Sequence, residues 1–245
     1  MIANRRTINI LGTKFHHVTR SEAAAFIVKC LQERKKASVF TPNPEIVMEA
    51  YHDTKLQAVL NDSELVVPDG IGVVIASKIL GQPLPERVAG YDLVQEVFRQ
   101  IENKEVSVYF LGAGQGVAEL AKEKMLDKYS NLKIVGVHNG FFDHDQDIVE
   151  RINATDPDFL LVGLGAPKQE YWIKNNRDRL KANVLMGVGG SFDGMSGKVR
   201  RAPKLFIKLG LEWFYRLITQ PTRAKRMLKL PIFMFKVIVE GKKYL

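Results

Sequence analysis

The amino-acid sequence predicts an α/β protein with a mainly parallel sheet, helices on both faces and a C-terminal basic amphipathic helical appendage. Two patterns predict the sheet: short β-branched or aromatic runs alternate with longer helix-like stretches, and polar or glycine-rich loops follow the runs. A third pattern, the concentration of positive charge after residue 197, predicts the appendage. We therefore expect a main domain over residues 1–197 and a helical appendage over residues 198–245.

Each element follows from a local pattern. Runs rich in Val, Ile, Leu and Phe predict strands at residues 37–40, 64–67, 106–111, 133–137, 159–162 and 184–188. Helical spacing of apolar residues predicts helices at residues 21–34, 45–60, 71–80, 92–102, 117–128, 147–154 and 168–180. Ser21 with Glu22, Asp92 and Asp147 stand where helix N-caps are expected.

The composition is that of an ordinary globular protein. Of 245 residues, 46% are hydrophobic and 26% are charged, which excludes a disordered or fibrous chain. The single cysteine, Cys30, excludes an intramolecular disulfide framework, so a reduced, cytoplasmic compartment is expected. The N-terminus does not look like a signal peptide, and no apolar run is long enough to span a bilayer.

The charge is unevenly distributed along the chain. In total, 36 Lys and Arg stand against 27 Asp and Glu, which gives a net charge of +9. Residues 198–245 hold 13 of the basic residues and two acids, Glu212 and Glu240, and therefore carry +11. The first 197 residues carry −2. The chain is thus a near-neutral body with a strongly basic tail.

Polar and glycine-rich loops follow the predicted strands. They are residues 41–44, 68–70, 112–116, 138–140, 163–167 and 189–193. The carboxyl ends of parallel strands meet at one edge of a sheet, and ligands of open α/β sheets bind there. We therefore expect one crevice, built from several of these loops, to be the functional site.

The loop Gly112-Ala-Gly114-Gln-Gly116 lies between a predicted strand and a predicted helix. Its glycines let the backbone approach a ligand, and free N–H groups at a helix start attract phosphate. A dinucleotide site would place the third glycine one position later and an acid at the end of the next strand, where His138 and Asn139 stand. NAD is therefore disfavoured, and a nucleotide diphosphate site at Gly112 and Gly114 or a tight turn without ligand remains.

Asp69 follows a strand-like run and precedes Gly70 and a predicted helix. A carboxylate in this place can cap the helix, or it can act as a general base that takes a proton from an acceptor hydroxyl. The same side chain can have both roles. From the neighbouring strand end, Thr41 and Asn43 offer a hydroxyl and an amide to the same crevice.

Two further loops carry side chains suited to a ligand. In residues 163–170, Lys168 offers a contact to phosphate, and Gln169 or Glu170 offers hydrogen bonds to a sugar or a base. A capping turn explains only part of this string. Arg87, before another predicted helix, offers a guanidinium to a diphosphate or a carboxylate.

Asp143-His-Asp145 spells the D-x-D pattern of metal-dependent sugar transferases. It leads directly into a polar helix start, where Asp147 continues the acidic run, so a solvated loop is expected. His16 and His17 have no partners at metal-ligand spacing. The sequence therefore predicts neither a metal site nor a cofactor.

Several strings, taken together and in this order, resemble the WecG/TagA/CpsF family of bacterial glycosyltransferases. They are Thr41-Pro-Asn-Pro44, Pro68-Asp69-Gly70, Arg87-Val-Ala-Gly90-Tyr-Asp92, Gly112-Ala-Gly114, residues 163–170, Gly187-Val-Gly-Gly-Ser-Phe-Asp193, Arg201-Ala-Pro-Lys204 and Gly210-Leu-Glu-Trp-Phe-Tyr-Arg216. The resemblance covers essentially the whole chain, and the Gly-Ala-Pro-Lys-Gln-Glu string at residues 165–170 is quite specific.

The resemblance implies a Rossmann-like fold and an inverting, metal-independent transfer. It implies that the sugar is N-acetylmannosamine, moved from its UDP donor to the 4-hydroxyl of undecaprenyl-diphosphate-linked N-acetylglucosamine in wall teichoic acid linkage-unit synthesis. By position, it implies that Asp69 is the catalytic base, with Thr41 nearby and Gln169 and Asp193 lining the pocket. The residues leave open another donor, UDP-N-acetylmannosaminuronate or UDP-glucose, and a nonenzymatic nucleotide-binding membrane scaffold.

The tail suits an anionic membrane surface better than other partners. Residues 203–219 predict a helix with a wide apolar arc, and Pro221 precedes a basic stretch rich in Met, Leu and Phe. We expect the tail to attach the protein peripherally to the inner face of the cell membrane and to close over the active site, with Arg216, Arg223 and Arg226 at the donor diphosphate. The alternatives are packing on the core or across a subunit interface of a homo-oligomer. Nucleic acid is not expected, because it does not explain the aliphatic surface.

Overall fold

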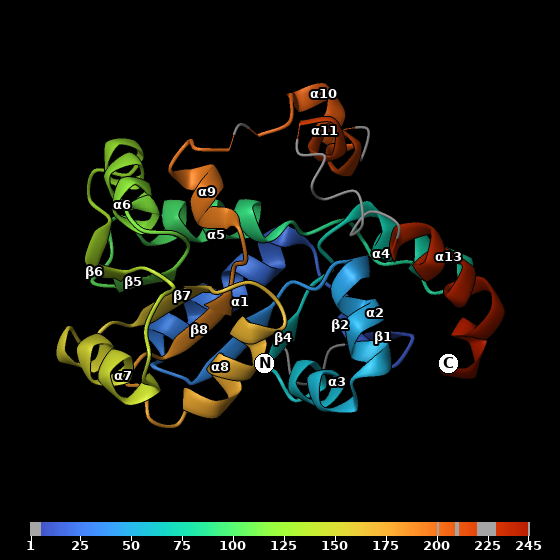
Figure 1. Ribbon diagram of the computed structural model, residues 1–245, viewed down its shortest axis with the longest axis horizontal. Helices are drawn as coiled ribbons and strands as arrows, with labels where there is room; N and C mark the ends of the chain where they lie inside the picture. Colours follow the sequence, from blue (N-terminus) through green and yellow to red (C-terminus); the bar gives the residue numbers. More distant parts are fainter. Residues whose placement is uncertain (1–5, 200, 209–210, 220–228, 245) are drawn as a thin grey trace.

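The central sheet confirms the predicted fold class (Figure 1). The computed structural model describes residues 6–199, 201–208, 211–219 and 229–244. Within them, a parallel sheet has the strand order β4-β3-β8-β7-β5-β6. Its strands are β3 (Ala37–Phe40), β4 (Leu65–Val66), β5 (Ser107–Gly112), β6 (Lys133–His138), β7 (Phe159–Gly163) and β8 (Val184–Gly187).

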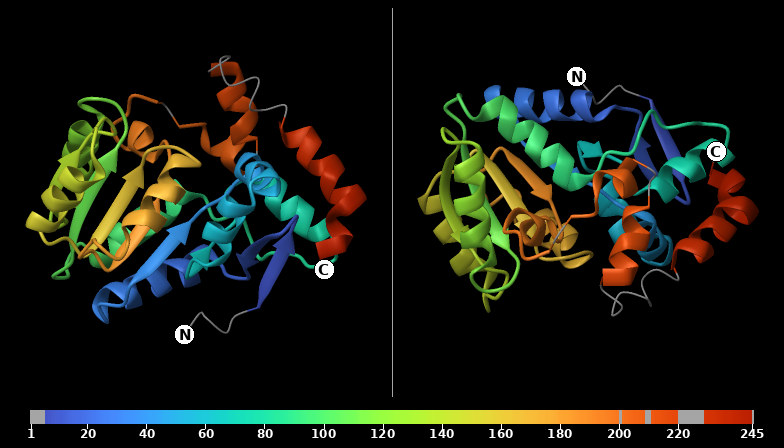
Figure 2. Two further views of the ribbon diagram at one scale, coloured as in Figure 1. Left: turned by 60° about the horizontal axis from the view of Figure 1, so that its bottom comes forward. Right: turned by 90° about the horizontal axis from the view of Figure 1, so that it is seen from above.

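Helices cover both faces of this sheet, as the sequence predicted (Figure 2). One face packs against α1 (Arg20–Gln32), α5 (Gly90–Ile101), α6 (Val117–Lys128) and the short α9 (Ser191–Met195). The other packs against α3 (Thr54–Asn61), α7 (Asp145–Ala154) and α8 (Lys168–Asn176). Successive strand residues alternate between the two hydrophobic clusters, so Phe110 enters the first and Tyr109 the second.

A third hydrophobic cluster joins the C-terminal helix to the body. It lies between the hairpin β1 (Thr7–Ile10) and β2 (Thr13–His16), α2 (Pro44–His52), α4 (Ile71–Ile79) and α13 (Lys229–Glu240). Phe233 and Val237 of α13 are fully buried in it. Figure 1 shows α13 beside α4 and α2, and the short helix η3 (Gly241–Tyr244) follows it.

Some predicted boundaries were wrong for identifiable reasons. The predicted helix over residues 45–60 is two helices, because Asp53 ends α2 and caps α3. Its Oδ1 accepts hydrogen bonds from the backbone N–H groups of Lys55 (3.0 Å) and Leu56 (3.2 Å). The hairpin β1–β2 was not predicted. It turns through Leu11 and Gly12, both with positive φ, as two-residue hairpin turns require.

The predicted N-caps were also wrong. Thr19, two residues before Ser21, caps α1 and forms a capping box with Glu22. Asp92 and Asp147 lie within the first turns of α5 and α7 instead of preceding them. Acids are favoured there by the helix dipole, so a first-turn acid looks like a cap in a sequence.

The tail contains shorter helices than expected. In place of one helix over residues 203–219, the structure describes α10 (Lys204–Lys208) and α11 (Glu212–Thr219). The sequence has Gly210 between them, and glycine is unfavourable inside a helix. Pro231 lies in the first turn of α13, where its missing N–H costs nothing. Pro221 lies outside the described residues. Among the helices that are described, none is long and apolar enough to cross a bilayer.

Candidate active site

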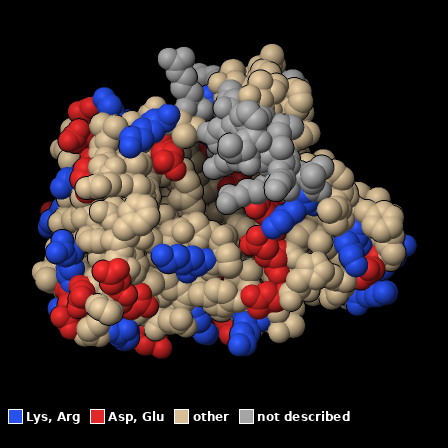
Figure 3. Space-filling view, viewed as in Figure 1, with Lys and Arg blue, Asp and Glu red and all other residues tan. Residues whose placement is uncertain are grey.

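A cavity of about 350 Å³ opens at the predicted edge of the sheet, among the loops that follow β3, β4, β7 and β8. Figure 3 shows a hollow near the centre of the face that it displays. The residues that line the cavity include Thr41, Asn43, Glu45, Glu49, Asp69, Arg87, Tyr91, Gln169, Ser191, Asp193, Arg201, Glu212, Trp213 and Leu230. A volume of this size suits a small-molecule substrate.

Asp69 presents a carboxylate to this cavity. Gly70, with a φ of 112°, is the N-cap of α4, and the side chain of Asp69 does not cap that helix. Instead, its Oδ2 accepts a hydrogen bond from the backbone N–H of Gly90 (3.2 Å), and 32% of the side chain is exposed. The N–H at the start of α5 thus fixes the orientation of the carboxylate. A held and accessible carboxylate has the geometry of a general base.

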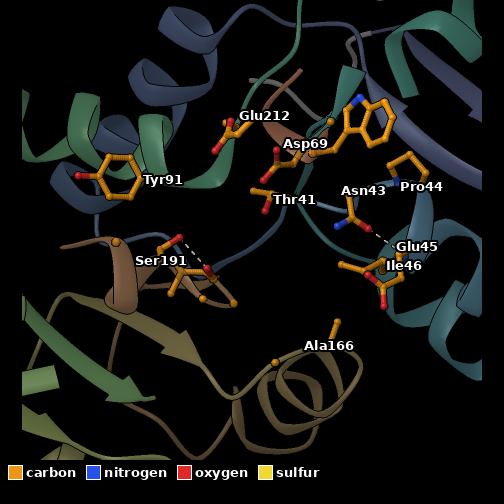
Figure 4. A pocket seen from close by; sticks show the side chains of 18 of the residues that line it. Thr41, Asn43, Pro44, Glu45, Ile46, Asp69, Tyr91, Ala166, Ser191 and Glu212 are labelled. Carbon is orange, nitrogen blue, oxygen red and sulfur yellow. Dashed lines mark hydrogen bonds between the residues drawn. The ribbon is translucent and has the colours of Figure 1, made fainter. Parts of the chain in front are cut away.

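Thr41 lies beside Asp69, as Figure 4 shows. A Cβ at Gly90 would come within 2.9 Å of the Thr41 Oγ1, so only glycine at the start of α5 leaves room for this hydroxyl. Gly90 therefore serves both side chains: its N–H binds Asp69, and its missing side chain admits Thr41.

Asn43 also lines the cavity, and half of its amide has a structural role. Its Oδ1 accepts a hydrogen bond from the backbone N–H of Ile46 (3.0 Å) and so caps α2. Figure 4 shows the amide nitrogen of Asn43 on the opposite side, toward the cavity. Pro44 at the first helical position is compatible with this cap.

Arg87 joins Asp69 to the tail. Its Nη2 donates to Oε2 of Glu212 on α11 at 2.6 Å, and its Nε lies 3.6 Å from Oδ1 of Asp69. Burial by itself lowers the pKa of Arg87, but the carboxylates of Asp69 and Glu212 outweigh burial and raise it. We expected the Arg87 guanidinium to contact a diphosphate or a carboxylate. In the structure it is paired with two carboxylates of the protein itself.

Gln169 lines the cavity from α8, and its amide is held at both ends. Its Oε1 accepts from the backbone N–H of Gly189 (2.9 Å), and its Nε2 donates to Oε1 of Glu170 (2.9 Å). Glu170 itself is 1% exposed, lies outside the cavity lining, and has its pKa raised by burial. Glu170 therefore contacts Gln169 and does not itself line the pocket.

The loop at residues 112–116, with Gly112 and Gly114, is not among the described residues that line this cavity. Gly112 has a φ of 132°, and a Cβ there would lie 2.4 Å from the carbonyl oxygen of Gly163. Its glycine is needed for the close approach of β5 and β7. Lys168 likewise lies outside the lining, with its Nζ 5.5 Å from the ring centre of Phe142.

Asp193 lines the cavity from α9, near Ser191. Asp145 of the D-x-D string does not line it: its carboxylate accepts hydrogen bonds from Trp172 Nε1 (2.9 Å) and Asn176 Nδ2 (3.1 Å), which tie α7 to α8. In the described parts of the chain, no cluster of His, Cys, Asp and Glu could hold a metal ion.

The sequence interpretation expected the tail to close over the site, but it did not name the residues of the tail and of α5 that line the cavity. Arg201 stacks on Tyr91, with its guanidinium carbon 4.7 Å from the ring centre, and its Nη2 lies 2.5 Å from Oδ2 of Asp92. Glu212 and Trp213 come from α11. One signal was present: Glu212 is the single acid between residues 198 and 239. Arg223, Arg226 and the side chain of Arg216 lie outside what the structure describes.

A parallel α/β sheet with a substrate-sized pocket at its strand ends defines an enzyme-like class of small-molecule binding folds. The sequence model of the glycosyl transferase WecG/TagA/CpsF family matches residues 8–244. The chain therefore belongs to the WecG/TagA/CpsF family of glycosyltransferases, as its motifs indicated.

Curated relatives agree with this assignment. A protein of Bacillus spizizenii is 39% identical over 208 residues, which cover 85% of this chain and 81% of the relative. A Bacillus subtilis protein is 39% identical over 212 residues, 86% and 83% of the two chains. A Staphylococcus aureus protein is 35% identical over 238 residues, 96% and 93%. All three are named N-acetylglucosaminyldiphosphoundecaprenol N-acetyl-beta-D-mannosaminyltransferase.

Proposed function

We propose that this glycosyltransferase moves N-acetylmannosamine from UDP-N-acetylmannosamine to the 4-hydroxyl of undecaprenyl-diphosphate-linked N-acetylglucosamine, with inversion, in wall teichoic acid linkage-unit synthesis. The names of the three relatives support the sugar and the lipid-linked acceptor. The observation that carries the proposal is the placement of Asp69: an accessible carboxylate, held by the N–H of Gly90, in a cavity of substrate size.

In the proposed reaction, Asp69 takes the proton of the acceptor hydroxyl as the hydroxyl oxygen attacks the anomeric carbon of the donor. The bond from that carbon to the phosphate oxygen breaks, and UDP leaves with the electron pair. One displacement inverts the anomeric configuration, so a single base at the attacking oxygen is sufficient. Thr41 and the amides of Asn43 and Gln169 are placed to orient the two sugars in the same cavity.

The departing diphosphate needs positive charge. The described lining has two arginines, Arg87 and Arg201, and more carboxylates than arginines. Its acids are Glu45, Glu49, Asp69, Asp193 and Glu212. Because anionic leaving groups are stabilised by preorganised cations and N–H donors, this excess of acid supports a contribution from the basic tail. We propose Arg216, Arg223 and Arg226 for that role, and the main-chain N–H groups near Gly112 and Gly114, with Lys168, as the second choice.

We further propose that residues 198–245 attach the protein peripherally to the anionic inner face of the cell membrane. The outer face of α13 exposes apolar side chains, and Leu230 at its start lines the cavity. The large apolar side chains that α13 exposes are Ile232, Phe235, Ile238 and Val239, and those that the neighbouring α4 exposes are Ile75 and Ile79. An apolar face of this kind next to lysines suits a lipid surface, and its nearness to the cavity suits a lipid-linked acceptor. In solution, we expect the same face to promote self-association.

A donor screen tests the proposal. The full-length protein is incubated with a short-chain lipid-diphosphate-N-acetylglucosamine acceptor and, separately, with UDP-N-acetylmannosamine, UDP-N-acetylmannosaminuronate or UDP-glucose, with and without EDTA. We expect product from UDP-N-acetylmannosamine alone, at a rate that EDTA does not change. Product from another donor would change the assigned substrate. Binding of UDP with no turnover of any donor would support a nonenzymatic scaffold and contradict the proposal.

A further inference from the structure

Glu170 is a buried acid that the proposed reaction does not use. It belongs to the first turn of α8, is only 1% exposed, and is not among the described residues that line the cavity. Its Oε1 accepts a hydrogen bond from Nε2 of Gln169 at 2.9 Å, whereas its Oε2 has no hydrogen-bond partner among the described residues. A buried polar atom without a partner lowers the stability of a fold, so packing alone does not account for a glutamate at this position.

The surroundings of Glu170 do not favour a charge. Burial raises the pKa of its carboxyl group, the hydrogen bond from Gln169 opposes this shift, and the carboxylate of Glu49 adds to it. Oε1 can accept a hydrogen bond whether the group is ionised or carries a proton on Oε2. The contact with Gln169 is therefore available in both protonation states.

This contact helps to fix the orientation of the Gln169 amide. The terminal torsion of a glutamine side chain is only broadly restrained by its own rotamer preferences, so its neighbours must fix it. The backbone N–H of Gly189 donates to Oε1 of Gln169 at 2.9 Å, and Glu170 accepts from the other end of the amide. Turning the amide over would place two donors opposite each other at Gly189 and would take Nε2 away from its acceptor.

The strand β8 ends in a glycine that makes room for this amide. A Cβ at Gly187 would lie 3.0 Å from Nε2 of Gln169 and 3.2 Å from Cδ1 of Phe40, so the amide packs closely against the strand end. Gln169 and Gly189 both line the cavity. Beyond its two hydrogen bonds, the amide retains one N–H and one lone pair that a ligand can use.

We infer that Glu170 is a positioning residue that holds the Gln169 amide in one orientation, so that its second N–H and second lone pair can bind a sugar hydroxyl or acetamido group. The inference rests on the proposed function, in which Gln169 helps to orient the two sugars. Glu170 lies outside the lining and acts through Gln169. A glutamate with one unpartnered oxygen is thereby explained by the function of its neighbour.

The test uses the full-length protein and compares Glu170→Met, which removes the acceptor, with Glu170→Gln, whose Oε1 can still accept. We expect kcat/KM with the short-chain acceptor and UDP-N-acetylmannosamine to fall about threefold to tenfold in Glu170→Met, as for the loss of one hydrogen bond. In Glu170→Gln, we expect kcat/KM to stay within about twofold of wild type, because the acceptor is kept. An equal loss in both variants, or no loss in Glu170→Met, would overturn the inference.

A double-mutant cycle shows whether Glu170 acts through Gln169. Glu170→Met is repeated in a Gln169→Leu background, in which there is no amide to hold. We expect the loss of kcat/KM caused by Glu170→Met to shrink to less than about twofold in this background. The same loss in both backgrounds would contradict the inference, because Glu170 would then act by another route.

The amide itself gives a readout that does not depend on turnover. Selective nitrogen labelling of glutamine makes the two Nε2 protons of Gln169 visible by NMR, and Gln169→Leu assigns their signals. We expect their exchange with solvent to become at least about tenfold faster in Glu170→Met and to stay unchanged in Glu170→Gln. Unchanged exchange in Glu170→Met would overturn the inference. If exchange changes as expected but wild-type protein makes no product from any donor, the proposed function fails and the positioning role stands.

Asn176→Leu is the matched control, because Asn176 is a fully buried amide on the same helix and does not line the cavity. Its Nδ2 donates to Oδ2 of Asp145 (3.1 Å) and to the carbonyl oxygen of Trp172 (3.0 Å). We expect Asn176→Leu to lower the midpoint of urea unfolding while kcat/KM stays within about twofold of wild type. A loss of kcat/KM equal to that in Glu170→Met would show that loosening of α8 explains the effect, against the inference. Glu170→Ala replaces Glu170→Met if that variant does not fold.

Discussion

The pocket has two walls that are held in different ways. The body wall consists of strand-end loops, and its side chains are fixed by main-chain groups: Ile46 N–H to Asn43, Gly90 N–H to Asp69 and Gly189 N–H to Gln169. The tail wall consists of Arg201, Glu212, Trp213 and Leu230. Ion pairs join it to the body: Arg201 to Asp92 (2.5 Å), Glu212 to Arg87 (2.6 Å) and, beside Leu230, Lys229 to Glu49 (2.7 Å). Leu230 also packs against the third hydrophobic cluster.

This difference suggests that the body wall carries the proposed catalytic groups and that the tail wall adjusts their activity. Main-chain hydrogen bonds at helix starts form together with the fold, so Asp69, the proposed base, and the polar groups of the body wall are in position when the sheet is complete. Ion pairs at a partly exposed surface are weaker and are screened by salt. We therefore expect changes in the body wall to remove activity, and changes in the tail wall to adjust it.

The largest effect is expected from Asp69→Asn in the body wall. The change removes the proposed base but keeps a polar side chain of the same size, so kcat should fall about 10²- to 10⁴-fold while UDP affinity is largely kept. Initial rates with the lipid acceptor and calorimetric titration with UDP measure the two quantities. Asp62→Asn is the control, because Asp62 pairs with Lys174 far along the chain and lies outside the cavity lining. Near-normal turnover of Asp69→Asn would remove Asp69 as the base.

The next largest effect is on the stability with which α13 packs on the body. Two phenylalanines on opposite faces of α13 serve as a test variant and its control. Phe233 is fully buried and Phe235 is 65% exposed. Phe233→Ala should lower the free energy of unfolding by about 3–5 kcal/mol. Phe235→Ala should change it by no more than about 0.5 kcal/mol, yet weaken sedimentation with anionic vesicles. Equal vesicle binding by wild type and Phe235→Ala would contradict the membrane role of that face.

A smaller effect distinguishes the glycine loop from the body wall. Gly112→Ala should lower stability by roughly 1–3 kcal/mol, because its Cβ meets the carbonyl of Gly163. Gly114→Ala should be nearly neutral in stability, since the nearest atom to its Cβ, on Val117, is 3.6 Å away. UDP affinity of Gly114→Ala then tests the predicted diphosphate contact. Because the loop is not among the described lining residues, we expect the UDP affinity to stay unchanged. A tenfold loss of affinity would instead indicate that the loop contacts the diphosphate.

The smallest effect is expected from single ion pairs of the tail wall. Arg201→Gln should lower the rate with a short-chain acceptor about twofold to fivefold at low salt, and less at high salt, because a partly exposed pair contributes little and is screened. Lys174→Gln, which breaks an exposed pair away from the pocket, should leave the rate unchanged. A loss for Arg201→Gln as large as that for Asp69→Asn would place Arg201 in the catalytic machinery.

The sequence predicted the body wall well because its residues stand at strand ends. Thr41, Asn43, Asp69, Gln169 and Asp193 each follow a strand-like run closely, and the parallel sheet then brings them to one cavity. Local pattern is sufficient for this, since the carboxyl ends of parallel strands share one edge.

The same reasoning does not reach residues whose position depends on strand order or on distant packing. Gly112 also ends a strand, but β5 is separated from β3 and β4 by β8 and β7, an order that no local pattern encodes. Arg201 and Glu212 enter the pocket through ion pairs with residues more than 100 positions earlier in the chain. The sequence predicted an amphipathic tail that closes over the site, but it did not indicate that these two side chains enter the pocket.

The most direct test of the central claim is the anomeric configuration of the product. A single displacement with Asp69 as base predicts that NMR of the lipid-linked disaccharide made from UDP-N-acetylmannosamine shows the inverted configuration at the new bond. Asp69→Asn is predicted to form little of this product under the same conditions. A product with retained configuration would contradict the account, because a single in-line displacement at the anomeric carbon must invert it.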